Sequence, residues 1–319
     1  MSFLINKGIV AAKAEGTPYT AEALVSADAD LRIMNASFTP NVEMHSHEIQ
    51  AGRHARKASI VGKQTGTLSF EVFLAYSGDN DTAPKIGTLL KGCGALETVN
   101  ASTSVVYTPS ETKDAQPISI WLAYKDSAAT QSIHTFKLSG AMGNCVLSFD
   151  NVGMPIKAAF EFQGVMQAEA QSTTLIALTS PDTAVPDSTR GSTITMAAGA
   201  VLTDSFTLDF GNQIEPIVDP SEDQGIKGFQ IVKRLPVMTI SPEIQLAAAG
   251  DESTFPYYTR WIAGTTGAFS LATDHYTIAA PVAQIDSYTP GDRNGALIRE
   301  VTMNLLESSG NDEWSITHS

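Results

Sequence analysis

Basic residues are scarce in this chain of 319 residues. Only 20 Lys and Arg stand against 34 Asp and Glu, which gives a formal net charge of −14. Proteins that bind nucleic acid by neutralising phosphates need clustered Lys and Arg, so this balance excludes that mode of binding. Charged residues of both signs make up 17% of the chain, too few for a disordered or coiled-coil protein.

Cysteine is almost absent. Cys93 and Cys145 are the two cysteines, and neither has a CxxC partner or a histidine beside it. This spacing excludes the usual zinc and redox motifs and predicts two reduced, partly buried thiols. We therefore expect no metal and no cofactor.

Long apolar runs are also missing. The N-terminal sequence MSFLINKGIVAAKAEG has no apolar stretch long enough for a signal peptide, and no segment approaches the roughly 20 apolar residues of a membrane span. We expect a chain that is made and assembled in a cytoplasm, without a membrane partner.

Apolar residues are nevertheless plentiful, at 43% of the chain, and Gly, Pro, Ser and Thr are spread throughout. The length allows one large core or two of about 150 residues each. Dispersed turn residues between short apolar segments are typical of β-rich proteins. The predicted class is all-β with little helix.

An internal repeat organises the chain. Shifting the sequence by 172 positions aligns residues 67–92 with residues 239–264 without a gap, and ten of the 26 pairs are identical. The same register reaches back to Phe38 and Phe210, and a shorter similarity at another offset relates residues 154–165 to residues 295–306. A repeat of this length predicts two copies of one structural unit.

Each unit shows the same order of predicted elements. Alternating apolar residues predict strands, and Pro near the start with Gly at the end predicts a short helix. The strands are expected at 31–39, 57–76, 117–124, 133–149 and 156–167, and again at 203–210, 229–248, 268–279, 284–289 and 296–306, with a long polar loop after the first strand of each unit.

The two helices are expected to begin at Thr82 and Thr254 and to end at Gly92 and Gly264. Their apolar residues share one helix face, which we interpret as the face that packs on the sheet. These residues are Ile86, Leu89 and Leu90 in the first unit and Tyr258, Trp261 and Ile262 in the second.

Composition also suggests domain limits. Residues 180–193, SPDTAVPDSTRGST, are rich in Pro, Asp, Ser and Gly, as expected of a linker. The predicted organisation is an N-terminal arm at 1–28, a first domain at 29–172, a linker at 173–195 and a second domain at 196–319.

Four segments, taken in order, resemble a known family. They are GTPYTAEAL (16–24), ADLRIMNASFTPNVE (29–43), KASIVGKQTGTLSFEVFL (57–74) and APKIGTLLKGCGALE (83–97). An arm, a strand, a long loop, a Gly-Thr-containing strand and a P-x-x-x-x-L-L helix in this order are similar to the tail tube proteins of siphophages. The resemblance covers the first half, and the second half follows through its similarity to the first.

This resemblance implies a structural virion protein of the phage tail, built as a tandem duplicated β-sandwich or barrel with one helix per unit. Stacked rings of such subunits would form a tube through which DNA is ejected into the host. A chain with two units resembles the duplicated form, in which three chains make a pseudo-sixfold ring. The implied partners are further copies of the chain, the tape measure protein, the tail terminator and tip proteins, and double-stranded DNA that passes without specific binding.

Enzymatic motifs are missing. The segment MHSHEIQAGRHARK (44–57) holds His45, His47 and His54, and His-x-His is a legitimate metal spacing. It lies in a predicted loop crowded with Arg53, Arg56 and Lys57, which favours a solvated contact loop. VGKQTG (61–66) lacks the glycine spacing and the Ser or Thr of a phosphate-binding loop and falls in a predicted strand. We expect no enzyme activity.

A non-enzymatic alternative is a carbohydrate-binding or adhesin-like β-sandwich. Such modules expose aromatic side chains on which sugars stack. The three tryptophans are Trp121 in a predicted strand, Trp261 on a helix face and Trp314 near the C-terminus, positions that favour core or interface. Polymerisation of the purified chain would separate a tube protein from an adhesin.

The polar residues that alternate with apolar ones in the predicted strands are the candidates for the wall of a DNA channel. An acidic, polar wall repels phosphates and keeps a duplex centred. The alternative is that some of them face the outer solvent or pack between subunits. The set is Ser69, Glu71, Glu161, Gln163, Ser241, Glu243, Glu300, Thr302 and Asn304.

The two long loops have opposite charge although they occupy equivalent positions. We interpret this as complementarity between neighbouring rings or chains, against the alternative that both are merely solvated, since an exposed ion pair contributes only about 0 to 1 kcal/mol. The predicted inter-ring contacts are Arg53, Arg56 and Lys57 in the first loop and Glu215, Asp219, Glu222 and Asp223 in the second.

Overall fold

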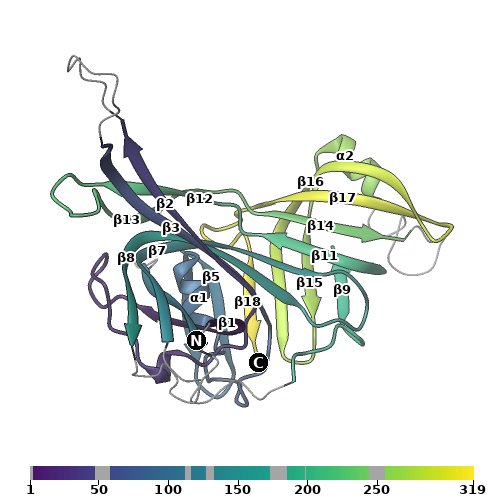
Figure 1. Ribbon diagram of the computed structural model, residues 1–319. Helices are drawn as coiled ribbons and strands as arrows, with labels where there is room; N and C mark the ends of the chain where they lie inside the picture. The colour runs from purple at the N-terminus through teal and green to yellow at the C-terminus, as the bar shows by residue number, and fades with distance from the viewer. Residues whose placement is uncertain are drawn as a thin grey trace.

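The structure is a computed structural model that describes residues 3–46, 58–111, 116–126, 133–172, 185–197, 199–243 and 256–319. These residues form eighteen β-strands, two α-helices and one 3₁₀ helix (Figure 1). The all-β class predicted from composition and alternation is confirmed.

The elements follow one another along the chain in this order: β1 (Phe3–Ala14), η1 (Ser26–Asp28), β2 (Met34–His45), β3 (Ile60–Phe73), α1 (Gly87–Gly92), β4 (Ala95–Asn100), β5 (Ser104–Pro109), β6 (Ile118–Asp126), β7 (Ile133–Phe149), β8 (Lys157–Ser172), β9 (Thr193–Met196), β10 (Gly199–Ala200), β11 (Thr203–Asp209), β12 (Asn212–Val218), β13 (Ile226–Arg234), β14 (Val237–Pro242), α2 (Tyr257–Ala263), β15 (Thr266–Ala272), β16 (Tyr276–Arg293), β17 (Ala296–Leu306) and β18 (Ser315–His318).

Eight strands lie side by side in an uninterrupted run. Their order is β2-β3-β8-β7-β11-β14-β17-β16, and every neighbouring pair is antiparallel. The first four strands come from the first half of the chain and the last four from the second half (Figure 1). The halves meet where β7 pairs with β11, from Phe149↔Phe206 to Val146↔Asp209. We call this pairing the internal seam.

Two of these strands are long enough to enter a second layer. The first part of β7 pairs with β6, which pairs with β1, and the first part of β16 pairs with β15 and β18. The C-terminal β18 also pairs with β5 from the first half. One hydrophobic cluster lies between the layers and contains residues of both halves, among them Phe70, Phe160, Tyr107, Phe206 and Trp314.

Both ends of the eight-stranded run are unpaired edges in the described part of the chain. Strand β2 pairs only with β3, and residues 285–293 of β16 pair only with β17. An unpaired edge presents a row of backbone N–H and C=O groups that can pair with another strand. The sheet can therefore be extended at either end.

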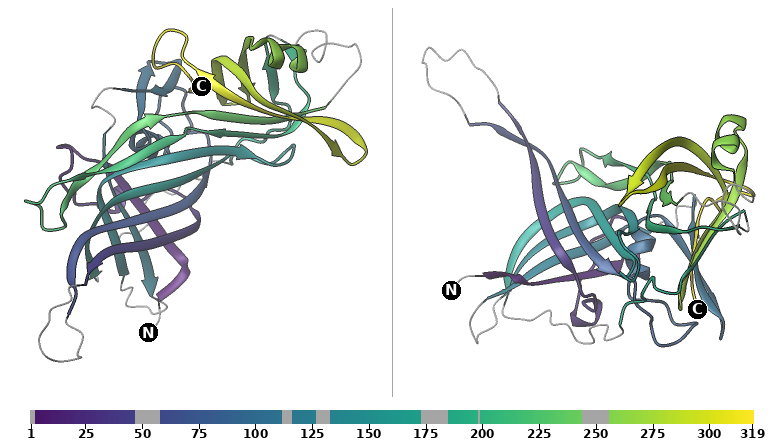
Figure 2. Two further views of the ribbon diagram at one scale, coloured as in Figure 1. Left: turned by 90° about the horizontal axis from the view of Figure 1, so that it is seen from above. Right: turned by 90° about the vertical axis from the view of Figure 1, so that its right-hand side faces the viewer.

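The regions predicted as long polar loops are largely β-hairpins. In the first half, β2 and β3 continue outward as one projecting hairpin (Figure 2), and residues 47–57 at its tip lie outside the described residues. In the second half, β12 and β13 form a separate hairpin that crosses β7 and β8. It bends away at Gly211, which has a φ of 63° and where any side chain would collide with the carbonyl of Leu235.

The predicted strand boundaries need two corrections. Residues 229–248 were expected to form one strand, but Pro236, which lacks an N–H for the ladder, separates β13 from β14. Residues 268–279 were also expected to form one strand and residues 284–289 another. Instead, a turn at 273–275 separates β15 from β16, closed by the Thr273 N–H donating to the Tyr276 carbonyl, and residues 284–289 lie inside the continuous strand β16. Strands β6, β7, β8 and β17 lie where they were predicted.

The predicted helix ends agree with the structure, but the predicted start of the first helix does not. Helix α1 begins at Gly87, not at Thr82, and Pro84 instead accepts a turn hydrogen bond from the Gly87 N–H. Thr254 lies outside the described residues, and α2 ends at Ala263 and is capped by Gly264, whose left-handed φ of 65° fits the predicted stop at this glycine.

The packing prediction holds fully for α1 and in part for α2. Leu89 and Leu90 are fully buried in the core, as expected. In contrast, Tyr258, Trp261 and Ile262 of α2 are 53%, 37% and 66% exposed. Tyr258 and Trp261 do contact Tyr288 of β16, so α2 lies on the sheet as predicted, but its apolar face is not buried there. The surroundings of the two helices differ: α1 packs against β1, β4, β6 and β7, whereas the main contact of α2 among the described residues is with β16.

Both cysteines are free thiols buried in the core, as the sequence predicts. Burial in apolar surroundings raises the pKa of Cys93 and of Cys145 well above the ordinary thiol value. Neither is therefore a reactive thiolate.

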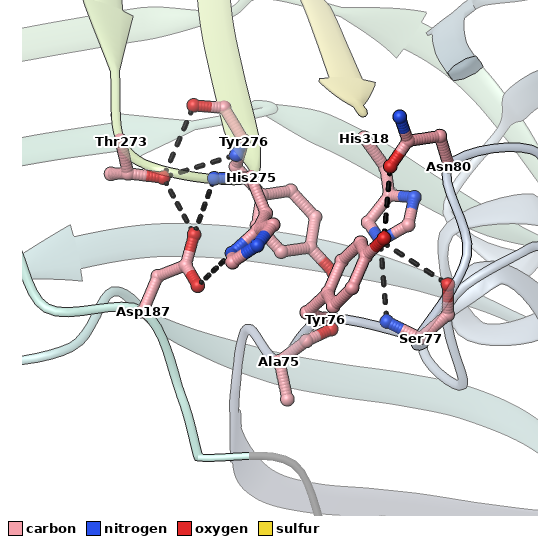
Figure 3. Close-up of polar contacts among 9 residues, drawn as sticks. All are labelled: Ala75, Tyr76, Ser77, Asn80, Asp187, Thr273, His275, Tyr276 and His318. Atoms are coloured by element: carbon pink, nitrogen blue, oxygen red, sulfur yellow. Dashed lines mark hydrogen bonds and ion pairs between the residues drawn. The ribbon is translucent and has the colours of Figure 1, made fainter. Parts of the chain in front are cut away.

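A cluster of aromatic and polar side chains fastens the second half to the first (Figure 3). Tyr76, which follows β3, lies between the imidazole rings of His275 and His318, at centroid distances of 4.0 and 5.2 Å. His275 contacts the buried Asp187 through Nδ1 at 2.7 Å, and the Ser77 N–H donates to Nε2 of His318 at 3.3 Å. The cluster thus joins both halves, the segment between them and the C-terminus.

This cluster predicts an acid-sensitive fold. His318 is fully buried, and this burial lowers its pKa below the ordinary histidine value. The unfolded chain therefore takes up a proton at a higher pH than the folded chain, so the free energy of unfolding is greatest above the ordinary pKa and decreases as the pH falls below it. The other titratable groups of the cluster are Tyr76, Asp187, His275 and Tyr276, whose ring lies 5.1 Å from that of His318.

Urea unfolding of the unassembled chain between about pH 8 and about pH 5 measures this dependence. His318→Phe keeps a ring beside Tyr76 but cannot be protonated, so we expect it to flatten the loss of stability on acidification. A His318→Phe chain that loses as much stability as the native chain over this interval would contradict the assignment to His318.

Candidate functional site

One face of the eight-stranded run carries all nine candidate channel residues. Directly opposite residues of neighbouring strands point to the same face of a sheet. The row that starts at Glu71 passes through seven strands in the order Glu71, Ala159, Val146, Asp209, Val237, Asn304 and Gln284. The row beside it passes through Lys157, Ser148, Thr207, Thr239, Thr302 and Ser287.

The other candidates join these rows by alternation or by pairing. Ser69 is two residues from Glu71 and lies opposite Glu161, while Gln163 lies two residues beyond Glu161. In the second half, Ser241 and Glu243 continue the alternation from Thr239, and Glu300 continues it from Thr302. We call this surface the polar face.

The opposite face of the same strands is the core. Leu68, Phe70, Phe160, Leu208 and Met303 alternate with the polar residues and are at most 2% exposed. The sequence thus folds these strands with one apolar and one polar side because its apolar residues recur every second position. The period-2 pattern decides which side chains reach the polar face.

Two carboxylates of the polar face are neutralised by cations. Glu71 lies 3.1 Å from the Lys157 ammonium, and Glu243 lies 2.9 Å from the Arg293 guanidinium. Asp209 accepts hydrogen bonds from the Asn144 side chain and from the Gly211 N–H. Its charge is therefore partly satisfied by neutral donors.

Glu161 and Glu300 differ from these residues. Both are exposed, and neither makes an ion pair with any described residue. They occupy matching positions in the two halves. Glu161 is two residues from Gln163, which lies opposite Thr67. Glu300 is two residues from Thr302, which lies opposite Thr239, the residue 172 positions after Thr67. Glu161 and Glu300 are therefore exposed negative charges that no cation of the described residues neutralises.

Part of the polar face lies beneath the β12–β13 hairpin. A cleft of about 540 Å³ lies between Thr67 and Gln163 on the face and Ile226 and Phe229 on the hairpin. A second cleft of about 400 Å³ is lined by Ser69, Glu71, Glu161 and Gln163 on the polar face and by Asn212 and Ile214 at the start of β12. Among the nine candidates, Gln163 is the one that lines both clefts.

The comparison with known families decides what kind of protein carries this sheet. A model of the family described as phage tail tube protein matches residues 6–305 of the 319. The chain belongs to the phage tail tube protein family. No curated protein matches the chain.

Membership of this family gives the protein a structural role in the phage tail, as a component of the virion that assembles with further copies into a tube. Within the described residues, no helix is long and apolar enough to cross a membrane. The polar face of the tail tube protein presents hydroxyl, amide and carboxylate groups, and its cations Lys157 and Arg293 are paired with Glu71 and Glu243.

The predicted inter-ring residues are described only in the second loop. Arg53, Arg56 and Lys57 lie outside the described residues. The acidic residues Glu215, Asp219, Glu222 and Asp223 lie on β12 and in the turn between β12 and β13.

The acidic turn touches its own chain at the base of the projecting hairpin. The Gln64 N–H donates to the Gln224 carbonyl at 3.2 Å, and Gly225 lies beside Lys63. Asp219 is fixed in the turn, because the Ser221 N–H and hydroxyl both donate to its carboxylate, and these bonds lower its pKa.

Sequence reasoning missed the internal seam and the two clefts. The seam depends on a register between strands about 60 residues apart, for which no local pattern exists. A signal for the bent hairpin was present in Gly211 and Pro236, a glycine and a proline that interrupt the alternation at matching points of β11–β12 and β13–β14.

Proposed function

We propose that three copies of this chain close into a ring, that the rings stack into the tail tube, and that the polar face lines the channel through which DNA is ejected into the host. The observation that carries this proposal is the eight-stranded run, with one polar face and an unpaired strand at each end. A sheet of this kind closes when the edge of one copy pairs with the opposite edge of the next, which removes all unpaired edges.

The internal seam supports the closure. In the chain, β7, the last strand of the first four, pairs with β11, the first strand of the second four. If the halves are two copies of one unit, β16 corresponds to β7 and β2 corresponds to β11. The pairing of β16 with β2 of the next copy would then repeat the internal seam, and three chains would present six quasi-equivalent units.

The same proposal gives the domain organisation. Residues 29–172 and 196–319 are the two tube units, residues 173–195 are the linker, and residues 1–28 are an N-terminal arm. The strand orders β2-β3-β8-β7 and β11-β14-β17-β16 support two units, since the first and second strand of each run pair with each other and the third returns beside the second.

Passage of DNA would depend on the absence of attraction. Ser69, Glu71, Glu161, Gln163, Ser241, Glu243, Glu300, Thr302 and Asn304 would line the channel with polar and acidic groups. Carboxylates repel the phosphates of a duplex and keep it away from the wall, and hydrated hydroxyl and amide groups offer no fixed site for it. No chemical step and no cofactor is involved.

Further partners follow from the place of a tube in a tail. The tape measure protein would fill the channel before ejection, terminator and tip proteins would close the ends, and the parts would meet in the host cytoplasm. Between rings, the acidic turn at Glu222 and Asp223 would contact Arg53, Arg56 and Lys57 of a neighbouring copy. Each such contact is weak, but repetition around every ring adds their effects.

Electron cryomicroscopy of tubes grown from the purified chain tests the proposal. We expect rings of three copies with the polar face inward and the acidic turn next to the basic segment of another copy. A ring of six whole chains, or a ring with the core-side layer facing the channel, would overturn the arrangement. Purified chain that stays monomeric at high concentration would overturn the proposed function itself.

A further inference from the structure

An aromatic surface on α2 has no counterpart on α1. In the 172-residue register, Tyr258, Trp261 and Ile262 correspond to Ile86, Leu89 and Leu90. The α1 residues are 3%, 0% and 0% exposed, whereas the α2 residues are 53%, 37% and 66% exposed. We call the three α2 residues together with Tyr288, on which Trp261 stacks at a centroid distance of 6.0 Å, the α2 patch.

Large apolar side chains gathered on one exposed helix face mark an interaction surface. Scattered apolar residues on a protein surface are common, but the three aromatic rings of this patch contact one another, and Ile262 follows Trp261 on the same helix. Tyr258 and Trp261 each contact Tyr288 with ring centroids 6.0 Å apart, and Tyr258 lies 6.4 Å from Trp261. The patch is therefore contiguous.

The α2 patch borders the unpaired edge of β16. The Trp261 indole N–H donates to the carbonyl of Asp286 at 3.0 Å, and the Gln284 side chain donates to the carbonyl of Gly264 at 3.0 Å. Asp286 and Tyr288 belong to the part of β16 that pairs only with β17. A strand that pairs with this edge comes within reach of the patch.

The internal seam indicates which segment would cover it. The turn after α1 is held by the β12–β13 hairpin of the second half: the Asn212 side chain donates to the Cys93 carbonyl at 2.7 Å, and Ile231 packs against Gly94. The same Asn212 side chain donates to the carbonyl of Gly143 in β7 at 3.0 Å. Asn212, the first residue of β12, therefore connects the β12–β13 hairpin both to the turn after α1 and to β7, a strand of the internal seam.

The equivalent hairpin in the first half is β2–β3, which projects from the body (Figure 2). Its outer part exposes apolar side chains: Val42 is 38% exposed, Ile60 59% and Val61 52%. The first half thus has an apolar hairpin that covers no helix of its own chain, and the second half has an apolar helix face that no hairpin covers among the described residues.

We infer that the α2 patch of one copy is covered by the β2–β3 hairpin of the neighbouring copy, through Val42, Ile60 and Val61. This inference rests on the proposed ring, in which β2 of the neighbour pairs with β16. It adds a second, apolar contact to the strand pairing and makes the helix of the second half a part of the subunit interface.

Cysteine pairs test the contact directly, because both native cysteines are buried and unreactive. Ile262→Cys is combined in one chain with Val42→Cys, Ile60→Cys or Val61→Cys, and tubes are oxidised and dissolved in denaturant. We expect at least one pair to give covalent dimers and trimers from tubes but not from dilute chain. The control pair is Ile262→Cys with Leu96→Cys, which is 46% exposed on β4 and is expected to stay uncrosslinked.

A charge in the patch tests its contribution to assembly. Ile262→Glu should leave the folded chain intact, because the side chain is exposed, yet raise the critical concentration for polymerisation at least about tenfold, since burying a charge in an apolar contact is costly. Val152→Glu, at a side chain that is 58% exposed in another part of the chain, is the matched control and should have little effect.

The outcomes separate this inference from the proposed function. Tubes that form normally with Ile262→Glu and give no cross-link with any of the three hairpin positions would overturn the inference and leave the ring intact. Native chain that forms no tubes would instead overturn the proposed function. Cross-links that form equally well in dilute chain would show that the patch is covered within one copy, which also overturns the inference.

Discussion

Replacing Glu161 and Glu300 by Lys is expected to slow DNA release at least about tenfold at low salt while tubes assemble at the native yield. Both side chains are exposed and lack an ion pair among the described residues, so their reversal breaks no contact within the fold. In the proposed ring the reversal puts six lysines per ring on the channel wall. Six to ten phosphate contacts lose about 10³ to 10⁵ in affinity between about 50 and 200 mM salt, so the delay should disappear as salt is raised.

The measurement is the rate of DNA release from triggered phage particles at several salt concentrations. Glu161→Gln with Glu300→Gln removes the charges without adding cations and should release DNA at nearly the native rate. Glu71 and Glu243 are poorer positions for this experiment, because their substitution also breaks the ion pairs with Lys157 and Arg293. A lysine variant that ejects its genome normally at low salt would show that the polar face does not line the channel.

Replacing Glu15 by Ala is expected to lower the free energy of unfolding by about 2 to 6 kcal/mol, since two buried donors lose their acceptor at about 1 to 3 kcal/mol each. Glu15 is 2% exposed and follows β1. Its Oε1 accepts hydrogen bonds from the Ser119 hydroxyl at 2.9 Å and from the Gly140 N–H at 2.7 Å. The carboxylate thereby fastens the end of β1 to β6 and to an irregular point of β7.

Glu15→Gln is the matched control, because its amide oxygen can accept the same two hydrogen bonds without a buried charge. Burial raises the pKa of Glu15, so this carboxyl favours folding most below the ordinary glutamate pKa, and its contribution is lost as the pH rises through the folded value. At neutral pH we therefore expect Gln to be at least as stable as Glu. A Gln chain as unstable as the Ala chain in urea would refute this role for the carboxylate.

The sequence was sufficient to predict which residues share the polar face. Alternation is a local property, and the nine candidates were chosen by it alone. The structure brings all nine onto one face because the rows through Glu71 and Thr302 cross from strand to strand without a register shift between β3 and β17. Whether that face lines a channel depends on the assembled ring and stays a prediction.

Contacts between distant segments could not be predicted in this way. The pairing of β18 with β5, the β12–β13 hairpin over β7 and β8, and the cluster around Tyr76 join residues far apart along the chain. The exposure of Trp261 could not be predicted from the sequence either. Its spacing matches that of the buried Leu89, and the two environments differ through long-range contacts, since α1 packs against β1, β4, β6 and β7 and α2 mainly against β16 among the described residues.

The internal seam has a consequence for how assembly responds to dilution. Because β7 and β11 belong to one polypeptide, they meet at an effective concentration set by the connecting chain and independent of how much protein is present. In the proposed ring, every second junction is of this kind and persists at any dilution. The critical concentration then reports only the junctions between β16 and β2, and a disassembling ring releases pairs of units that remain joined.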